Sequence, residues 1–173
     1  DNEYFTNHKV KNNSLSRYIL SVGRFIEKKN LIRLLNAFEI YKKSHGNLDL
    51  LLIGSGPDED LIRSVIANSR YKNSVYIKSW QQINTLPNYY KNAAFFVLAS
   101  TNDQWGLVVN EALASGTICL VSKECGCCID LIDEGLTGWS FNPYDENELS
   151  ELFHRSEKLD LHRLDIMKKN IKS

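Results

Sequence analysis

The stretch over residues 18–44 reads YILSVGRFIEKKNLIRLLNAFEIYKKS, and the rest of the chain repeats its pattern. It begins with a short apolar run that ends at Gly23, which is typical of a strand buried on both faces. Over 30–44, apolar side chains recur at the i, i+3, i+4, i+7 spacing of an amphipathic helix: Leu31, Leu34, Leu35, Phe38 and Tyr41. The stretch therefore predicts a buried strand followed by a helix.

The same alternation of short apolar runs and helical patterns continues along the chain. Further strands are predicted at 49–53, 74–78, 95–98, 117–121 and 138–141, and further helices at 59–69, 83–91, 106–115 and 145–158. Asp58 stands where it can cap the helix over 59–69. Strand and helix in repeated alternation predict an α/β fold of Rossmann-like type, with three α/β/α layers around a parallel sheet.

The pattern also suggests how the chain is divided. We expect residues 17–158 to form the domain and 1–16 to be a linker or the edge of a neighbouring domain. Residues 159–173 have thin hydrophobicity, and we expect a C-terminal helix without a partner, or a tail.

The composition is that of an ordinary soluble domain and excludes several classes of protein. The chain has 173 residues, of which 43% are hydrophobic, and its 21 basic and 21 acidic side chains leave no net charge. No run approaches the roughly 20 apolar residues that a membrane span needs. A neutral chain also argues against nucleic acid as the main partner.

All four cysteines lie within ten residues, at Cys119, Cys125, Cys127 and Cys128. A disulfide framework would spread its cysteines along the chain, and a zinc site would need a second pair of ligands that the sequence does not offer. We therefore expect reduced thiols, no bound metal and a cytoplasmic protein.

Ligands of an open parallel sheet bind in the loops that follow the carboxyl ends of the strands. The first such loop, Gly23–Asn30, carries Arg24 and Lys29 near the start of a helix, where free N–H groups and the helix dipole favour phosphate. A solvated turn with surface charges explains the loop equally well. Both interpretations stay open at this point.

The second and third loops are less informative. The second, Gly54–Pro57, contains half of a dinucleotide-binding fingerprint, but it lacks the third glycine and the following acidic residue, so a tight turn is favoured. In the third, Ser79 and Trp80 follow a strand, where an exposed ring can hold a base or simply cap the core.

The fourth loop, Ser100–Gly116, is the most informative. Asp103 and Glu111 lie eight residues apart, on either side of a helix start at Gly106. Because Glu111 stands among apolar residues, we expect it to be buried with a partner, since an unpaired buried charge is costly. The two carboxylates suggest a site for hydroxyls and phosphates, the alternative being a capping Asp and a solvated Glu. The glycines of the fifth loop, 124–138, indicate close backbone approach or merely turns.

Taken together, these loops resemble the C-terminal, nucleotide-sugar-binding half of a GT-B glycosyltransferase of the retaining group known as family 4 or group 1. The resemblance covers about residues 17–158. The residues that carry it are Val22-Gly23-Arg24-Phe25 with Lys29-Asn30, Ile53-Gly54-Ser55-Gly56-Pro57, Trp105-Gly106-Leu107-Val108-Val109-Asn110-Glu111-Ala112, and Gly126-Cys127-Cys128-Ile129-Asp130-Leu131-Ile132 with Gly135-Leu136-Thr137-Gly138.

The resemblance implies a diphosphate site that needs neither a metal nor a cofactor. Arg24 and Lys29 match the basic pair that neutralises the donor diphosphate. Gly106, Leu107 and Val108 match the helix start that presents backbone N–H groups to the phosphates.

The resemblance also implies a catalytic pair of carboxylates, Asp103 and Glu111, at the two acidic positions of an E-x7-E motif. Glu111 matches the residue that binds the donor ribose. Asp103 stands where the family more often has Glu, and its shorter reach weakens the implied contact with the donor sugar. Ser79 and Trp80 fall near the base. Cys127 replaces a frequent Gly and is interpreted as variation and not as a nucleophile.

The implied function is that of the donor domain of a hexosyltransferase, whose missing N-terminal half binds the acceptor. Such a chain would bind a nucleotide-diphosphate sugar but transfer little alone. The resemblance suggests bacterial polysaccharide or glycoconjugate synthesis at the inner face of the membrane, with a lipid-linked or polysaccharide acceptor. A non-catalytic nucleotide- or sugar-binding module on the same fold is the alternative. A receiver-like signalling domain is disfavoured, because Gly23 and Arg24 stand where it would carry acidic residues.

Overall fold

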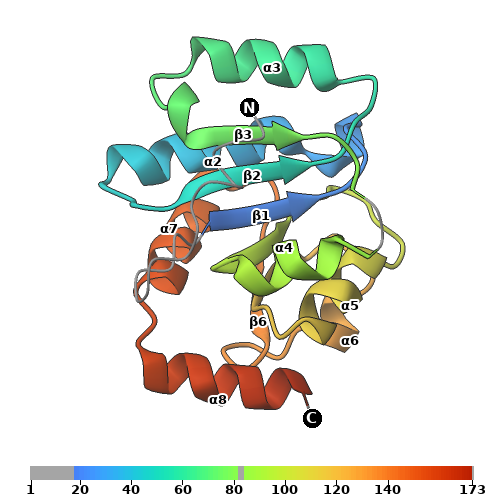
Figure 1. Cartoon of the computed structure of the whole chain (residues 1–173), viewed down its shortest axis with the longest axis vertical. Helices are drawn as coiled ribbons and strands as arrows, with labels where there is room; N and C mark the ends of the chain where they lie inside the picture. Colours follow the sequence, from blue (N-terminus) through green and yellow to red (C-terminus); the bar gives the residue numbers. More distant parts are fainter. Residues whose placement is uncertain (1–17, 82–83, 173) are drawn as a thin grey trace.

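The short apolar runs form a six-stranded parallel sheet in the computed structural model, which describes residues 18–81 and 84–172 (Figure 1). The strand order is β3-β2-β1-β4-β5-β6, so the order reverses between β1 and β4. Every paired strand is parallel to its neighbour. The strands are β1 (Tyr18–Val22), β2 (Asp49–Ile53), β3 (Val75–Lys78), β4 (Phe95–Leu98), β5 (Cys119–Ser122) and β6 (Gly138–Phe141).

Helices and short 3-10 turns connect the strands. They are η1 (Glu27–Lys29), α2 (Leu31–Lys43), α3 (Glu59–Asn68), η2 (Lys72–Ser74), α4 (Leu86–Asn92), α5 (Leu107–Ala114), α6 (Cys128–Leu131), α7 (Glu146–Glu157) and α8 (Leu161–Lys172). The helix predicted from residue 83 begins at Leu86, and residues 82–83 lie outside the described residues. β5 starts two residues later than predicted because Thr117 belongs to the turn after α5, where its hydroxyl donates to the carbonyl of Tyr90.

The sheet separates two hydrophobic layers, because successive side chains of a strand point to opposite faces. On one face, residues such as Ile19 pack with α2, α3, α7 and part of α8. On the other face, residues such as Leu20 pack with α4, α5 and α6. Figure 1 shows these helices on the two sides of the strands. This arrangement confirms the predicted three-layer, Rossmann-like α/β fold.

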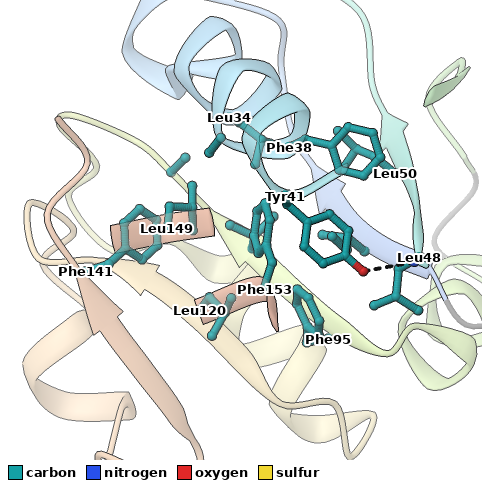
Figure 2. Close-up of a cluster of buried hydrophobic side chains, with 14 of the residues drawn as sticks. Leu34, Phe38, Tyr41, Leu48, Leu50, Phe95, Leu120, Phe141, Leu149 and Phe153 are labelled. Carbon is teal, nitrogen blue, oxygen red and sulfur yellow. Dashed lines mark hydrogen bonds between the residues drawn. The ribbon is translucent and has the colours of Figure 1, made fainter. Parts of the chain in front are cut away.

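Tyr41 of α2 lies at the centre of the first layer (Figure 2). Its ring meets the ring of Phe153 edge to face, with 5.7 Å between centroids. Its hydroxyl donates to a carboxylate oxygen of Glu157 at 2.6 Å and accepts from the backbone N–H of Leu48 at 2.9 Å. The one polar atom of this buried side chain is therefore fully used, as a buried hydroxyl requires.

The C-terminal helix has a partner, contrary to the expectation from the sequence. Leu164 and Met167 of α8 are buried in the first layer. The guanidinium of Arg163 donates to the carbonyl of Gly135 at 2.7 Å. Leu164 and Met167 are three residues apart and so share one face of the helix, which is enough to dock it despite its polar composition. No helix within the described part of the chain is long and apolar enough to cross a membrane.

The aspartates at the starts of α3 and α7 differ from each other. Asp58 occupies the N-cap position of α3, but its side chain makes no capping hydrogen bond, so the predicted cap is wrong. Asp145 at the start of α7 accepts from the backbone N–H groups of Asn147 and Glu148, each at 3.0 Å. The backbone explains the difference, because Asp145 is extended, as a capping residue should be, whereas Asp58 has φ −88° and ψ 5°.

Candidate functional site

The reversal of strand order between β1 and β4 marks the place where an open parallel sheet binds its ligands. Connections after the two strands leave toward opposite faces of the sheet, which opens a crevice at their carboxyl ends. The bordering loops run from Gly23 to Asn30 after β1 and from Ala99 to Gly106 after β4. These are the first and fourth loops that the sequence singled out.

Lys29 and Asp103 meet across this crevice. The ammonium of Lys29 forms an ion pair with the Oδ2 atom of Asp103, although the two residues are 74 positions apart in the sequence. Only 16% and 14% of the two side chains are exposed. The hydroxyl of Ser100 also donates to Oδ2, at 3.2 Å. The structure therefore brings together a residue predicted to bind phosphate and one predicted to bind the sugar.

Asn30, which the sequence analysis gave no role, holds the loop that carries Lys29. Its side-chain amide is buried and donates to the carbonyls of Ala99 at 3.0 Å and Pro143 at 2.9 Å. Its backbone is left-handed, with φ 57°. Asn tolerates this conformation better than most other residues with a side chain, so an Asn at the first position of a predicted helix is a signal that could have identified it.

Arg24 lies at the rim of the same site. It is exposed, and together with Lys29 it lines a small recess at the end of β1 that also includes Ser21, Gly23 and Leu98. The two predicted phosphate-binding cations therefore face one recess, although only Lys29 is held by a carboxylate.

The glycines of the second loop serve packing against the first loop. A Cβ atom on Gly54 would lie 1.9 Å from the carbonyl oxygen of Gly23, and one on Gly56 would lie 2.3 Å from that of Phe25. The backbone N–H of Phe25 also donates to the carbonyl of Ser55 at 2.9 Å. These contacts favour the tight-turn interpretation over half of a dinucleotide-binding fingerprint.

The amino terminus of α5 is open toward the crevice loops. Gly106 precedes the helix with φ +63°, and no side chain of the described residues caps it by a hydrogen bond. The first N–H groups of a helix, here including those of Leu107 and Val108, have no partner within the helix and carry the positive end of its dipole. Such an end attracts an anion.

Residues of the fifth loop pack against the segment that leads into α5. The N–H of Gly126 donates to the carbonyl of Asp103 at 2.8 Å. A Cβ atom on Gly106 would lie 2.8 Å from the sulfur of Cys127. Of the two interpretations of the fifth-loop glycines, close backbone approach therefore applies to Gly126, whose own Cβ would lie 2.1 Å from the carbonyl oxygen of Gln104.

All four cysteines are buried and free. Burial raises the pKa of Cys127 to about 11 and that of Cys125 to about 12. Because a nucleophilic cysteine must ionise near neutral pH, these thiols do not have the properties of nucleophiles. Within residues 18–81 and 84–172, no three His, Cys, Asp or Glu side chains are grouped so that they could hold a metal ion.

Glu111 has a partner but is not buried, which corrects one expectation from the sequence. α5 buries only Val109 and Ala112, and the carboxylate of Glu111 stands on an exposed face. The hydroxyl of Tyr90 in α4 donates to its Oε2 atom at 2.9 Å. Burial raises the pKa of Tyr90 well above its usual value, and the nearby charge of Glu111 adds to this shift.

Ser79 and Trp80 lie apart from the other predicted residues. They follow β3, which is the edge strand two positions from β1, and both are exposed. The amide of Gln81 donates to the carbonyl of Ser79 at 2.7 Å. No contact joins Ser79 or Trp80 to Lys29, Asp103 or Glu111 among the residues that the structure describes, so their role near a base stays a prediction.

Comparisons with known proteins give one consistent result. Residues 5–173 match the family described as Glycosyl transferases group 1. An alpha-monoglucosyldiacylglycerol synthase from Streptococcus pneumoniae is 33% identical over 99 residues, which are 57% of this chain and 22% of that protein. The amylovoran biosynthesis glycosyltransferase AmsK from Erwinia amylovora is 29% identical over 143 residues, which are 79% of this chain and 35% of that protein.

The fold has counterparts among solved structures. A variant of TarM from S. aureus, crystallised with fondaparinux, alpha-GlcNAc-glycerol and UDP, superposes with a TM-score of 0.81 at 17% sequence identity. The match covers 95% of this chain and 33% of TarM. The chain thus spans about a fifth to a third of the length of these three proteins.

Proposed function

The chain belongs to the group 1 glycosyltransferases, and from this premise we propose that it is a domain that binds a nucleotide-diphosphate sugar for retaining transfer of a hexosyl group. The observation that carries the proposal is the pairing of Lys29 with Asp103 at the crevice between β1 and β4. Cation, carboxylate and open helix terminus lie on loops that border the place where the fold binds ligands.

The diphosphate would be neutralised by this chain's own groups. Arg24 and Lys29 supply positive charge, and the backbone N–H groups of Gly106, Leu107 and Val108 supply hydrogen bonds at the positive end of the α5 dipole. Donors aimed at the leaving diphosphate stabilise the charge that develops on it as the sugar departs. We therefore expect no metal requirement and no cofactor other than the donor itself.

The two carboxylates would bind hydroxyls of the donor. Glu111 presents an exposed carboxylate on α5, which suits the ribose. Asp103 would contact the donor sugar while it shares Lys29 with the diphosphate. Ser79 and Trp80 would lie toward the base. In this arrangement the catalytic roles belong to Asp103 and Glu111, since both touch the donor.

The acceptor would come from a second half that this chain does not contain. Three large apolar side chains of the fourth and fifth loops are exposed, Trp105 at 48%, Leu107 at 67% and Ile129 at 92%. Large apolar side chains exposed on the loops of a site suggest a surface that another domain covers. The acceptor would be lipid-linked or a polysaccharide, as in synthesis of bacterial glycoconjugates at the inner face of the membrane.

Calorimetric titration of UDP and GDP against matched lysine variants tests the proposal. We expect saturable binding of one nucleotide below millimolar concentration, unchanged by EDTA. Lys29→Met should weaken it by about tenfold to about a hundredfold, because a hydrogen bond to a charged group contributes roughly 1.5–3 kcal/mol. Lys28→Met is the control, because the side chain of Lys28 is next to Lys29 in the sequence but is exposed. The change leaves the backbone of Lys28 intact, so its carbonyl still accepts from the N–H of Thr101. Absence of binding below millimolar for both nucleotides and their sugars would overturn the proposal.

A further inference from the structure

We propose that Tyr90 is a positioning residue, which holds the carboxylate of Glu111 in the orientation that receives the donor ribose. The inference rests on the proposed function, because it concerns the same site. Its basis is the hydrogen bond of 2.9 Å from the Tyr90 hydroxyl to the Oε2 atom of Glu111. The two residues come from different helices, α4 and α5.

An exposed glutamate needs such a partner if it is to bind a hydroxyl with a defined geometry. Its side chain has three rotatable bonds, and fixing them on ligand binding costs conformational entropy. The hydrogen bond from Tyr90 engages one carboxylate oxygen before the ligand arrives, so that part of this cost has already been met. A group held in place in this way binds its ligand more tightly than a mobile one.

Tyr90 is itself rigidly placed. Its side chain is only 1% exposed, and its ring meets the ring of Phe96 in β4 edge to face, with 5.5 Å between centroids. Its backbone carbonyl accepts from the hydroxyl of Thr117 at 2.7 Å. The packing of its ring and its backbone hydrogen bond therefore fix the position of the Tyr90 hydroxyl, which lies at the boundary between the core and the exposed carboxylate of Glu111.

The chain contains a matched pair of tyrosines that separates positioning from stability. Tyr41 is also buried and also donates its hydroxyl to a carboxylate, that of Glu157, at 2.6 Å. It lies in the layer on the opposite face of the sheet (Figure 2). Replacing either tyrosine by Phe removes one hydroxyl and keeps the ring, so both changes remove a partly buried hydrogen bond to a carboxylate. Tyr41→Phe also takes the acceptor from the backbone N–H of Leu48, so it is the more demanding control for stability.

The experiment compares Tyr90→Phe and Tyr41→Phe in calorimetric titrations with UDP and with 2′,3′-dideoxy-UDP, or with the GDP pair if the protein prefers guanine. We expect Tyr90→Phe to weaken binding of the full nucleotide about fivefold to tenfold. Binding of the dideoxy analogue should change less than about twofold, because Glu111 has no hydroxyl to receive there. Tyr41→Phe should leave both affinities unchanged while lowering the melting temperature.

Each other result overturns the inference. Equal losses for the two nucleotides would show that Tyr90 acts only through the stability of the site, and an unchanged affinity for the full nucleotide would show that it does not act on the ribose. Both outcomes leave the proposed function intact, since the unaltered protein still binds. Failure of the unaltered protein to bind any of these nucleotides would overturn the proposed function together with this inference.

Discussion

The Lys29–Asp103 pair places a carboxylate where the group 1 pattern more often has the longer Glu. The shorter side chain of Asp103 contacts the ammonium of Lys29 and accepts from Ser100. An incoming diphosphate would have to share Lys29 with Asp103. The charges of Lys29 and Asp103 cancel, so the pair attracts an anion only weakly. Most of the positive charge that an anion meets from outside would then come from Arg24 and from the start of α5.

Gly106 is a residue at which a small change should disturb the site directly, because it forms the start of α5. Gly106→Ala would place a side chain at φ +63° and 2.8 Å from the sulfur of Cys127. The left-handed backbone costs about 1–2 kcal/mol and overpacking roughly 1–3 kcal/mol more. We expect a loss of free energy of unfolding of about 2–5 kcal/mol, measured by urea denaturation.

A double-variant cycle separates the two causes. Cys127→Ala removes the sulfur that a side chain at Gly106 would meet, so the double variant should recover the overpacking part and keep the backbone part. Strictly additive losses would contradict the proposed contact.

At the scale of elements, three helix starts show three ways of treating free N–H groups. α7 begins with a side-chain cap from Asp145, and α3 begins at Asp58 without one. α5 begins at Gly106, which offers no side chain at all. Among these, α5 is the helix whose terminus lies beside Asp103 and Lys29. An uncapped terminus leaves its N–H groups for a ligand, at some cost in stability of the empty protein.

The two aspartates make a test of this comparison. Asp145→Ala should lower the free energy of unfolding by about 1 kcal/mol, because two backbone N–H groups lose their acceptor. Asp58→Ala should cost about half of that or less, since only the interaction with the helix dipole is lost. Urea denaturation of both variants measures the difference, and equal losses would count against the geometry of the α7 cap.

At the scale of the whole molecule, the strand order decides where function can lie. Because the order reverses between β1 and β4, only the loops after these two strands border the crevice, although every strand of the sheet has a loop at its carboxyl end. Two exposed apolar residues, Trp105 and Leu107, belong to the fourth loop, which borders the crevice. A third, Ile129, belongs to the adjoining fifth loop. The donor and a second domain would therefore meet on one side of this chain.

We expect the 173-residue chain to bind donor but not to transfer its sugar. The reason is that it spans 22% and 35% of two relatives, and that under our proposal a second domain supplies the acceptor. The measurement is transfer of radiolabelled sugar to acceptor lipid by this chain and by a longer form that includes a second domain. Transfer at equal rates by both forms would contradict the expectation, and no transfer by either would favour a non-catalytic binding module.

The alternation of strands and helices, and the loops proposed for the site, could be predicted from the order of the residues. These features follow from local periodicity, since a buried strand and an amphipathic helix each leave their own spacing of apolar residues. Prediction from the sequence was wrong where the outcome depends on which residues pack nearby. Asp58 has the residue type of a helix cap but not the backbone conformation of one. Glu111 is exposed and α8 packs against the first layer, both contrary to expectation.

Which side chains meet became known from the folded chain and could not be predicted from the sequence. Lys29 contacts Asp103 across 74 positions, Tyr90 contacts Glu111 across 21, and Asn30 binds the carbonyl of Pro143 across 113. Local spacing carries no information on such pairs, because they depend on the order in which the strands assemble into the sheet. That order placed β1 beside β4, and with them the cation beside the carboxylate.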